Sequence, residues 1–467
     1  MLKTDSISIN DQLDDLINKM DSNGQFISIV HKINHVDPIS VFASRPDLKG
    51  ERYYWTSADG QLTFVGLGFS NQLYSSHASD RFTAIESALQ SQKHRVFRST
   101  NARITGTGPV YFGGFSFFDD DHKGEWKHFP TNHFVLPKRL VTVTDQGCYL
   151  TLNIWIDQSH SVDEVHSIIE SEISQIESVE SYEEKSMKQV DLKNEMTYQE
   201  WEQLINQAIH EIQSTKLDKV VLAREIETYF NQDIPIEKVL KALSEQQERS
   251  YIFIMENDDQ AFIGATPERL VEVHNNEIQS ACLAGTTSRG SSMDEDEWKA
   301  IQLLKDEKNL EEHQYVVKMI QEAISPLCDS LRVPNQPMIR KLSKIQHLFT
   351  PVTGSLKTNV TIFDALKQLH PTPALGGEPR EIAMEFIKQH EPIERGWYAA
   401  PIGWFDDELN GEFAVAIRSA LITGEKANLF AGCGIVADSE PKAEYEETHL
   451  KFSPMLDALG GHNHDNE

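Results

Sequence analysis

Segments typical of β-strands recur along the whole chain, and they constrain the fold more than any other feature of the sequence. In the N-terminal half they include FISIVHKI, RYYWTS and HFVLPKRLVTVT, all rich in β-branched and aromatic residues. Residues 251–270 have the pattern of a hairpin around NDDQ, followed by a turn at Thr266-Pro267-Glu268. Helical segments occur between the strands without the regular β–α–β alternation of a parallel sheet. The sequence therefore predicts an α+β fold with mostly antiparallel sheets.

The charge balance limits the partners of this chain. It has 467 residues and a formal charge of −29, from 72 acidic and 43 basic residues. A field of that sign repels nucleic-acid phosphates and anionic membrane surfaces, so neither is an expected partner. An anionic substrate could bind only where a metal ion, or a few inward-facing Lys and Arg side chains, reverse the local potential.

The cysteines and the N-terminal residues indicate a cytoplasmic protein. Cys148, Cys282, Cys328 and Cys433 are widely spaced and include no CxxC pair, which predicts reduced thiols and neither a disulfide framework nor a zinc site. The first twenty residues, MLKTDSISINDQLDDLINKM, lack the apolar run of a signal peptide. No later segment reaches the roughly 18 apolar residues that cross a bilayer.

An acidic, polar run at 174–195 separates two parts of the chain. A run so poor in large apolar residues is typical of a surface connector. We therefore expect residues 1–195 to form the N-terminal part of the fold, residues 196–458 a catalytic region, and residues 459–467 a frayed tail. The paired glycines of PVYFGGFSFF at 109–118 predict a bulge or a close approach of two backbones.

Two elements at the start of the second part are well defined by their sequence. Thr197 and Glu200 form a capping box, which predicts the start of a helix. The segment KVVLAR at 219–224 is a predicted strand. Because side chains alternate along a strand, Lys219 shares a face with Val221 and is partly desolvated.

Further along, residues 295–325 form a long helix-favouring run, in which Glu312, Val316 and Ile320 are predicted to lie on one stripe beside the core. Asn410-Gly411 is a strong hairpin turn signal. The strand after it, EFAVAIRSAL, places Arg418 on a face with three alanines. Small neighbours leave space in front of the guanidinium, which favours a bidentate contact with an anion.

The segment GCGIVADSEPKAEYEETHLK at 432–451 joins a glycine turn to a predicted helix. Pro441 suits the first turn of that helix, where its missing N–H costs nothing. Glu444, Glu447 and Lys451 follow at spacings of three and four, so they share one face. Two carboxylates on one face can supply the oxygen ligands that Mg²⁺ prefers. An ordinary solvated face with a Glu447–Lys451 ion pair explains the same residues.

Several motifs, taken together and in order, resemble those of the chorismate-utilising enzymes. The resemblance implies two antiparallel sheets packed face to face, with helices outside and an active site between the layers. Within the family, the motifs are most similar to those of members that form isochorismate for menaquinone synthesis. Such members add water at C2 of chorismate with loss of the C4 hydroxyl, and they depend on Mg²⁺. The motifs, all within residues 196–458, are KVVLAR, GATPERL, LAGT, LEEHQ, IQHLFT, PTPALGGEPR and the closing GCG/EYEET element.

The resemblance also implies a role for each matching residue. Lys219 would be the general base that activates water, and Glu268 the general acid that protonates the departing hydroxyl. Glu312 and Glu447 would hold Mg²⁺, with Glu444 nearby through water. The substrate pocket would contain Tyr398, Arg418, Gly432 and Gly434 around the enolpyruvyl carboxylate, and Gly285, Thr286, His347, Ala374 and Lys451 elsewhere.

The chemistry of water addition requires such residues in any case. Water attacks only when a base takes its proton, and hydroxide leaves only when an acid donates one. Lys219 must be neutral when it acts, and Glu268 must be protonated, which requires a pKa raised from about 4.3 by an apolar site. Alone, Lys219 is explained as a surface lysine, Glu268 as a solvated turn residue and His347 as a core histidine. Their occurrence together in this order favours a catalytic site.

Other functions are compatible with parts of this pattern. Relatives that add ammonia lack a lysine at the position of Lys219, or carry a lysine that bonds to the ring at the position of Ala284. Salicylate-forming relatives tend to carry threonine in place of Ala374, so alanine favours isochorismate as the end product. A catalytically silent chorismate-binding subunit would have lost the base, the acid or a metal carboxylate, and all are present. The same reaction serves menaquinone and siderophore synthesis, and the sequence predicts no oligomeric state.

Overall fold

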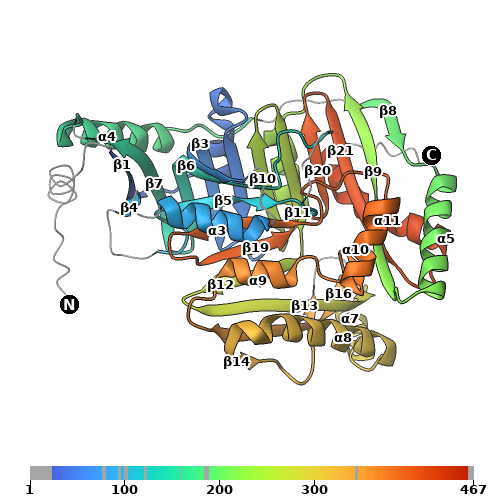
Figure 1. The fold of residues 1–467 in the computed structure, drawn as a ribbon. Coiled ribbons are helices and arrows are strands. Elements are labelled where there is room, and N and C mark those ends of the chain that lie inside the picture. Colours follow the sequence, from blue (N-terminus) through green and yellow to red (C-terminus); the bar gives the residue numbers. More distant parts are fainter. Residues whose placement is uncertain are drawn as a thin grey trace.

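Two β-sheets that share one strand make up the centre of the molecule (Figure 1). The shared strand is β6 (Asn132–Thr144), which pairs with β7 near its end and with β5 near its start. The computed structural model describes residues 24–75, 80–92, 96–98, 104–119, 124–157, 159–183, 189–341 and 345–460.

The first sheet runs from β6 in both directions. Two strands pair with the far edge of β9. β17 pairs with its first residues and β8 with its last. In spatial order the strands are β4 (Val96–Arg98), β1 (Gln25–Ile33), β7 (Gly147–Ile156), β6, β3 (Leu62–Tyr74), β2 (Arg52–Thr56), β10 (Tyr251–Asn257), β11 (Gln260–Thr266), β20 (Ser419–Thr423), β21 (Lys426–Ile435), β9 (Lys219–Phe230), and then β8 (Gln189–Glu195) and β17 (Gly377–Glu378).

The second sheet leaves β6 through β5. Its last long strand, β16, pairs with two short strands on its outer edge. In spatial order the strands are β5 (Val110–Phe115), β18 (Pro401–Asp406), β19 (Gly411–Val415), β12 (Arg269–His274), β13 (Glu277–Ser288), β16 (Ile345–Leu356), and then β14 (Cys328–Arg332) and β15 (Met338–Lys341).

The inner faces of the two sheets pack on each other through aromatic side chains. Tyr53 of β2 stacks on Phe112 of β5 with ring centroids 4.6 Å apart, and Phe64 of β3 meets Trp404 of β18 edge-on at 5.2 Å. Such contacts add to the large apolar area that each ring buries. Every described strand pair is antiparallel except β1 with β4. The predicted fold class, two face-to-face and mostly antiparallel sheets with helices outside, is confirmed.

Helices cover the outer faces. α4, α6 and α11 bury apolar side chains on the first sheet, and α5 and α10 pack near the start of β9. α8 lies along β13 of the second sheet, at the bottom of Figure 1. The helices are α2 (Pro38–Ala43), α3 (Arg81–Gln92), α4 (Val162–Glu177), α5 (Tyr198–Ser214), α6 (Ile236–Gln246), α7 (Met293–Leu303), α8 (Glu307–Ile324), α9 (Ile362–Leu369), α10 (Arg380–His390) and α11 (Pro441–Ala458).

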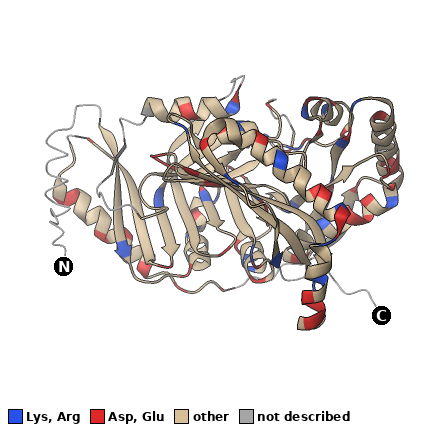
Figure 2. Ribbon diagram, turned by 90° about the horizontal axis from the view of Figure 1, so that it is seen from below, with Lys and Arg blue, Asp and Glu red and all other residues tan. Residues whose placement is uncertain are grey.

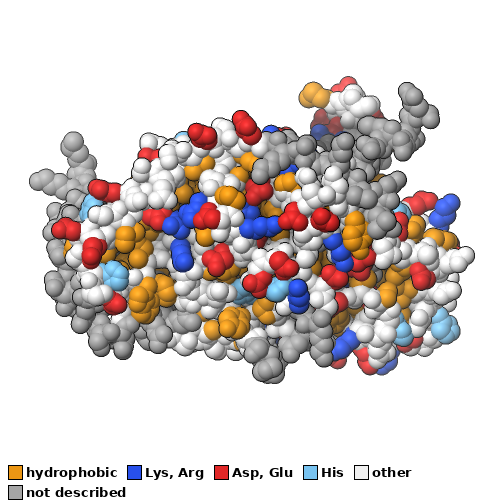
Figure 3. All heavy atoms as spheres, turned by 90° about the horizontal axis from the view of Figure 1, so that it is seen from above, with side chains coloured by type: hydrophobic (Ala, Val, Ile, Leu, Met, Phe, Trp, Pro, Cys, Tyr) orange, Lys and Arg blue, Asp and Glu red, His pale blue; other side chains and the backbone are white. Residues whose placement is uncertain are grey.

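Charged residues lie mostly on the helices and loops, while the strands are largely uncharged (Figure 2). On the face shown in Figure 3, acidic and basic side chains are interspersed with apolar ones. No helix among the described residues is both long and apolar enough to span a bilayer. All four cysteines are buried free thiols, as predicted.

Several local predictions are confirmed. Thr197 and Glu200 form both hydrogen bonds of the capping box at the start of α5. The hairpin around NDDQ is β10–β11, and the turn at Thr266-Pro267-Glu268 separates β11 from β12. A Cβ on Gly113 would lie 1.9 Å from the carbonyl oxygen of His133, so the predicted close approach of two backbones occurs there.

The helix-favouring run at 295–325 forms two helices, α7 and α8. Asp306 separates them and caps the second helix by accepting a hydrogen bond from the Asn309 N–H. A capping aspartate offers the backbone an alternative to a continuous helix, which periodicity alone did not reveal. Within α8, Ile320 is buried and Glu312 is exposed.

The single strand predicted for EFAVAIRSAL is also wrong. β19 ends at Val415 in the second sheet and β20 begins at Ser419 in the first, so the chain crosses between the sheets over residues 416–418. Arg418 has φ of 53° at this crossing, which breaks the alternation that would have put it beside the alanines. The crossing brings Arg418 to the gap between the sheets.

The predicted boundary at residues 174–195 does not coincide with a break in the sheets. α4 ends within this run, and β8 begins within it. Strands from both sides of the run pair with each other, as β2 does with β10 and β5 with β18. The predicted tail at 459–467 lies outside the described residues apart from Leu459 and Gly460.

Candidate active site

A cavity of about 230 Å³ lies where the chain crosses between the two sheets. The turn after β11, the crossing before β20 and the end of β21 all contribute to its wall. Half of the residues that the sequence predicted for the site line this cavity. They are Glu268, His347, Ala374, Tyr398, Arg418, Gly432 and Lys451.

Lys219, the predicted base, starts β9 and is half-buried. Val221, two residues further along the strand, lines the cavity, so alternation puts the lysine on the cavity face. Gly434 of β21 makes room for its side chain, because a Cβ there would lie 2.7 Å from Lys219 Cε and 3.3 Å from Nζ. The predicted partial desolvation of Lys219 is confirmed.

Glu268, the predicted acid, lies in the turn between β11 and β12. Its N–H donates to Thr266 Oγ1 at 3.2 Å, and its carbonyl oxygen accepts from the Val415 N–H at 3.0 Å, so both ends of the residue are fixed. Burial raises the pKa of its carboxyl to about 7, while the nearby charges of Lys451 and Arg418 oppose this shift. A carboxyl that keeps its proton near neutral pH can serve as a general acid.

Tyr398 and Arg418 form the end of the cavity next to β21. Tyr398 is buried and stacks on Phe430 with ring centroids 5.4 Å apart. Its hydroxyl lies over Gly432, where a Cβ would be only 3.2 Å away. Arg418 forms no ion pair with a carboxylate among the described residues. A phenol and an unpaired guanidinium at one end of a cavity are suited to bind a carboxylate.

Gly432 and Gly434 lie inside β21 and not in the predicted glycine turn, which is a correction. They are opposite Ala223 and Val221 of β9. The N–H groups of Ala223 and Val221 donate to Glu391 and to Gly376, away from β21. In an antiparallel ladder, two directly opposite residues either both point their N–H and C=O groups toward each other or both point them away from each other. The N–H groups of both glycines therefore point away from β9, beyond the point where β20 ends.

His347 lines the cavity, and Gly285 and Thr286 are next to it in the sheet but are not lining residues. Thr286 Oγ1 and His347 Nδ1 are 2.8 Å apart. Burial, with the nearby charge of Arg340, lowers the pKa of His347, so the ring is neutral at neutral pH. Gly285 has φ of 75° at a bulge in β13, a conformation that favours glycine. Gly285 and Thr286 thus position the histidine and do not themselves line the cavity.

The three carboxylates predicted to bind Mg²⁺ are not gathered into one cluster. Among the described residues, no group of three or more His, Cys, Asp or Glu side chains is placed to hold a metal ion. Glu447 of α11 forms an ion pair of 2.6 Å with Lys451 of the same helix. Glu444, also on α11, lies beside Cys433 of β21. Glu312 is on α8 and exposed. The donor set of carboxylate oxygens suits Mg²⁺, and the magnesium site stays a prediction.

Sequence reasoning missed three cationic residues of the cavity wall. Arg395 is buried, forms a bidentate ion pair with Glu391 and donates to the carbonyl oxygen of Val221 at 2.8 Å. Arg395 lies three residues before Tyr398, a predicted site residue, and this closeness in the sequence was the available signal for it. Arg249 and Arg340 also line the cavity. Neither lies within a quoted motif, although Arg340 is five residues before IQHLFT, and no local pattern marks them. With Arg418 and Lys451, these side chains provide the local positive charge that an acidic protein needs to bind an anion.

Comparisons with known proteins identify the family of the chain. A family model described as chorismate binding enzyme matches residues 11–460. The chain is 41% identical, over 93% of either chain, to the isochorismate synthase MenF of Bacillus subtilis. It is 35% identical to the salicylate biosynthesis isochorismate synthase of Pseudomonas aeruginosa, over 92% of this chain and 89% of the relative.

Solved structures show the same fold. MenF, the menaquinone-specific isochorismate synthase of Escherichia coli, matches with a TM-score of 0.79 and 24% identity, over 97% of this chain and 99% of that one. Component I of anthranilate synthase from Streptococcus pneumoniae matches with a TM-score of 0.71 and 21% identity, over 85% of this chain and 92% of that one. Because the family model and the relatives each cover nearly its whole length, the chain belongs to the chorismate binding enzyme family.

Proposed function

We propose that the chain is an isochorismate synthase, which converts chorismate to isochorismate with Mg²⁺. The observation that carries the proposal is Glu268, a carboxyl with a pKa of about 7 in a cavity whose other charged groups are cationic. Relatives at 41% and 35% identity are named isochorismate synthases, which supports the same activity here.

In the proposed reaction, Lys219 removes a proton from the attacking water, and Glu268 donates a proton to the departing hydroxyl. Neutral Lys219 takes a proton from water as its oxygen forms a bond to C2 of the ring. Both ring double bonds shift, from C1=C2 to C1=C6 and from C5=C6 to C4=C5. The C4–oxygen bond breaks, and Glu268 donates its proton to the departing hydroxyl, which leaves as water. Burial of Glu268 supports this division of roles, because it keeps the acid protonated near neutral pH.

The anionic groups of chorismate would be held by the cationic side of the cavity. Tyr398, Arg418 and the N–H groups of Gly432 and Gly434 would receive the enolpyruvyl carboxylate. Lys451 donates to the carbonyl oxygen of Gly432 at 2.8 Å, which fixes this edge of β21. A planar guanidinium with backbone donors is a common means of binding a carboxylate.

Glu312 and Glu447 would hold Mg²⁺, with Glu444 nearby through water. When bound, the ion would supply positive charge for the ring carboxylate in a protein whose own net charge is negative. Mg²⁺ typically needs only one or two protein carboxylates, because water and the anionic substrate complete its ligands. Glu447 would exchange its ion pair with Lys451 for the metal.

Glu447→Gln should raise the Mg²⁺ concentration needed for half-maximal activity by about tenfold or more, since it removes one charged ligand. The measurement is initial rate against Mg²⁺ concentration at saturating chorismate. Glu446→Gln, an exposed neighbour on α11, is the matched control and should keep the wild-type dependence. An unchanged dependence in Glu447→Gln would place the metal elsewhere.

Gly434→Ala should lower kcat by about tenfold to a hundredfold, because the new methyl group displaces the amine of Lys219 from its place beside β21. The flexible end of the lysine can move aside, so the thermal unfolding midpoint should change little. The measurement is steady-state turnover of chorismate. Combining this change with Lys219→Ala should cost no more than Lys219→Ala alone. Additive losses would mean that the glycine acts independently of the lysine.

A second candidate is a salicylate synthase, which would eliminate pyruvate after adding water. Ala374 lines the cavity, at the position where salicylate-forming relatives tend to carry threonine, and this favours isochorismate as the end product. Purified protein incubated with chorismate and Mg²⁺ should give isochorismate by chromatography, and EDTA should abolish it. Salicylate as the main product would establish the second candidate, and an amine product with added ammonium would refute both.

We infer menaquinone synthesis as the pathway, since a MenF enzyme is 41% identical over 93% of the chain. Siderophore synthesis uses the same reaction and is the alternative. The free thiols of all four cysteines support the predicted cytoplasmic location.

A further inference from the structure

Besides Arg418, two arginines in the cavity wall have no carboxylate partner among the described residues, although the chain has 72 acidic residues. They are Arg249 and Arg340. Arg249 donates to the carbonyl oxygen of Lys341, and Arg340 packs its guanidinium over the ring of Phe349 at 5.3 Å. In so acidic a protein, guanidinium groups without carboxylates are available to an external anion.

These two arginines lie where the active-site cavity meets the surface. Both line the cavity, and both also line an adjoining groove of about 650 Å³ beside β2 and the end of α6. Arg249 is exposed and Arg340 is half-buried. A substrate that enters the cavity from this groove must pass between or beside them.

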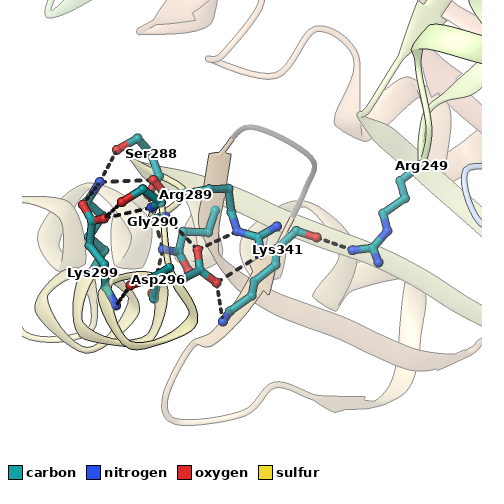
Figure 4. A network of polar contacts seen from close by, with 11 residues as sticks. Arg249, Ser288, Arg289, Gly290, Asp296, Lys299 and Lys341 are labelled. Carbon is teal, nitrogen blue, oxygen red and sulfur yellow. Dashed lines mark hydrogen bonds and ion pairs between the residues drawn. The ribbon is translucent and has the colours of Figure 1, made fainter.

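A polar network holds Lys341, the neighbour of Arg340 in the chain, and includes Arg249 (Figure 4). Lys341 follows Arg340 at the end of β15, and its Nζ lies 2.8 Å from Asp296 of α7. Asp296 also accepts from Arg289 Nε at 2.6 Å and from the Gly290 N–H at 3.0 Å. In Figure 4, Arg249 reaches the same end of β15 from the other side, through the Lys341 carbonyl oxygen. The network ties the strand that carries Arg340 to α7 and to Arg249.

We propose that Arg249 and Arg340 form a capture site for a carboxylate of chorismate at the mouth of the cavity. This inference rests on the proposed function and adds the route and the first contact of the substrate. Chorismate is a dianion, and the net charge of −29 repels it. Paired guanidinium groups at the mouth reverse the local potential and guide the anion toward Arg418. Asp59 and Glu248 also line the groove and oppose this field, so the arginines must outweigh them.

The two residues act on binding and not on the chemical step. Removing either charge should therefore lower kcat/KM and leave kcat nearly unchanged. It should also weaken the dependence of kcat/KM on salt, because part of the attraction that salt screens is gone. A purely structural role would instead lower thermal stability, or lower kcat and kcat/KM together.

The test compares Arg249→Gln, Arg340→Gln and Arg340→Lys with wild type at low and high NaCl. Arg332→Gln is the matched control, because Arg332 is exposed on the neighbouring β14, pairs with Glu277 and does not line the cavity. We expect kcat/KM to fall about tenfold in each glutamine variant, with a flatter salt dependence, and to recover in part in Arg340→Lys. Arg332→Gln should match wild type.

The inference is overturned if the glutamine variants keep the wild-type kcat/KM, or if Arg332→Gln loses as much as they do. A loss that appears equally in kcat, or with a lowered unfolding midpoint, also overturns it, since that result indicates damage to the fold. These outcomes leave the proposed function intact when wild type forms isochorismate. If wild type forms none, the proposed function itself has failed.

Discussion

Lys219→Ala is expected to lower kcat by about a hundredfold or more, because it removes the group that takes the proton from the attacking water. The side chain lies on the cavity face of β9, where Gly434 leaves room for it, and Lys219 is the one lysine of that strand. Lys219 pairs with Glu378 of β17, and Val220 beside it pairs on both sides, so the fold should not depend on the lysine side chain.

The loss should be specific to this position. Lys216→Ala removes an exposed lysine three residues earlier and is the matched control, with turnover close to wild type expected. Isochorismate formation is followed by chromatography, and thermal unfolding of each variant checks the fold. Near-normal turnover in Lys219→Ala would remove this residue from the mechanism.

Glu268→Gln is expected to lower kcat by a similar factor of about a hundred or more, because an amide cannot donate a proton to the departing hydroxyl. Glutamine has nearly the same shape, and the anchoring hydrogen bonds of residue 268 come from its backbone. The fold should therefore survive. Glu297→Gln, which makes the same change on an exposed part of α7, should retain wild-type turnover.

The same carboxyl predicts the pH dependence of the wild-type enzyme. With a pKa of about 7, Glu268 is mainly protonated below neutral pH and loses the required proton as the pH rises above it. The value of kcat/KM should therefore fall on the alkaline side with an apparent pKa near 7, since that limb reports the free enzyme. Glu268→Gln should lack this limb in its residual activity. A limb that persists unchanged in the variant would belong to another group.

The fold was predictable from the sequence because its main signals are local. The alternation in KVVLAR, the hairpin around NDDQ and the capping box at Thr197 each specify an element within a few residues, and the structure contains all three. The errors occurred where contacts between residues far apart in the sequence determine the local structure. EFAVAIRSAL has the alternation of one strand, yet its two ends pair in different sheets, and only the tertiary structure shows that Arg418 lies at the crossing.

The candidate site was predictable in part, for the same reason. Glu268 and Gly432 belong to recognisable motifs, Tyr398 and Arg418 match single positions of the family, and the fold brings all four to one cavity. The raised pKa of Glu268 results from burial between the sheets, which no local pattern encodes. The sequence did not reveal Arg249 and Arg340, because they can bind an anion only where the fold places no carboxylate beside them, and no local pattern encodes that.

The source of the new oxygen tests the central claim most directly. The claim is that the enzyme activates a water molecule from solution and adds it at C2 as the C4 hydroxyl leaves. Incubation of wild-type protein with chorismate and Mg²⁺ in H₂¹⁸O should give isochorismate that carries one ¹⁸O atom, located at C2 by mass spectrometry. Isochorismate without the label would contradict the account, because the hydroxyl would then have moved within the substrate and no activated water would be needed.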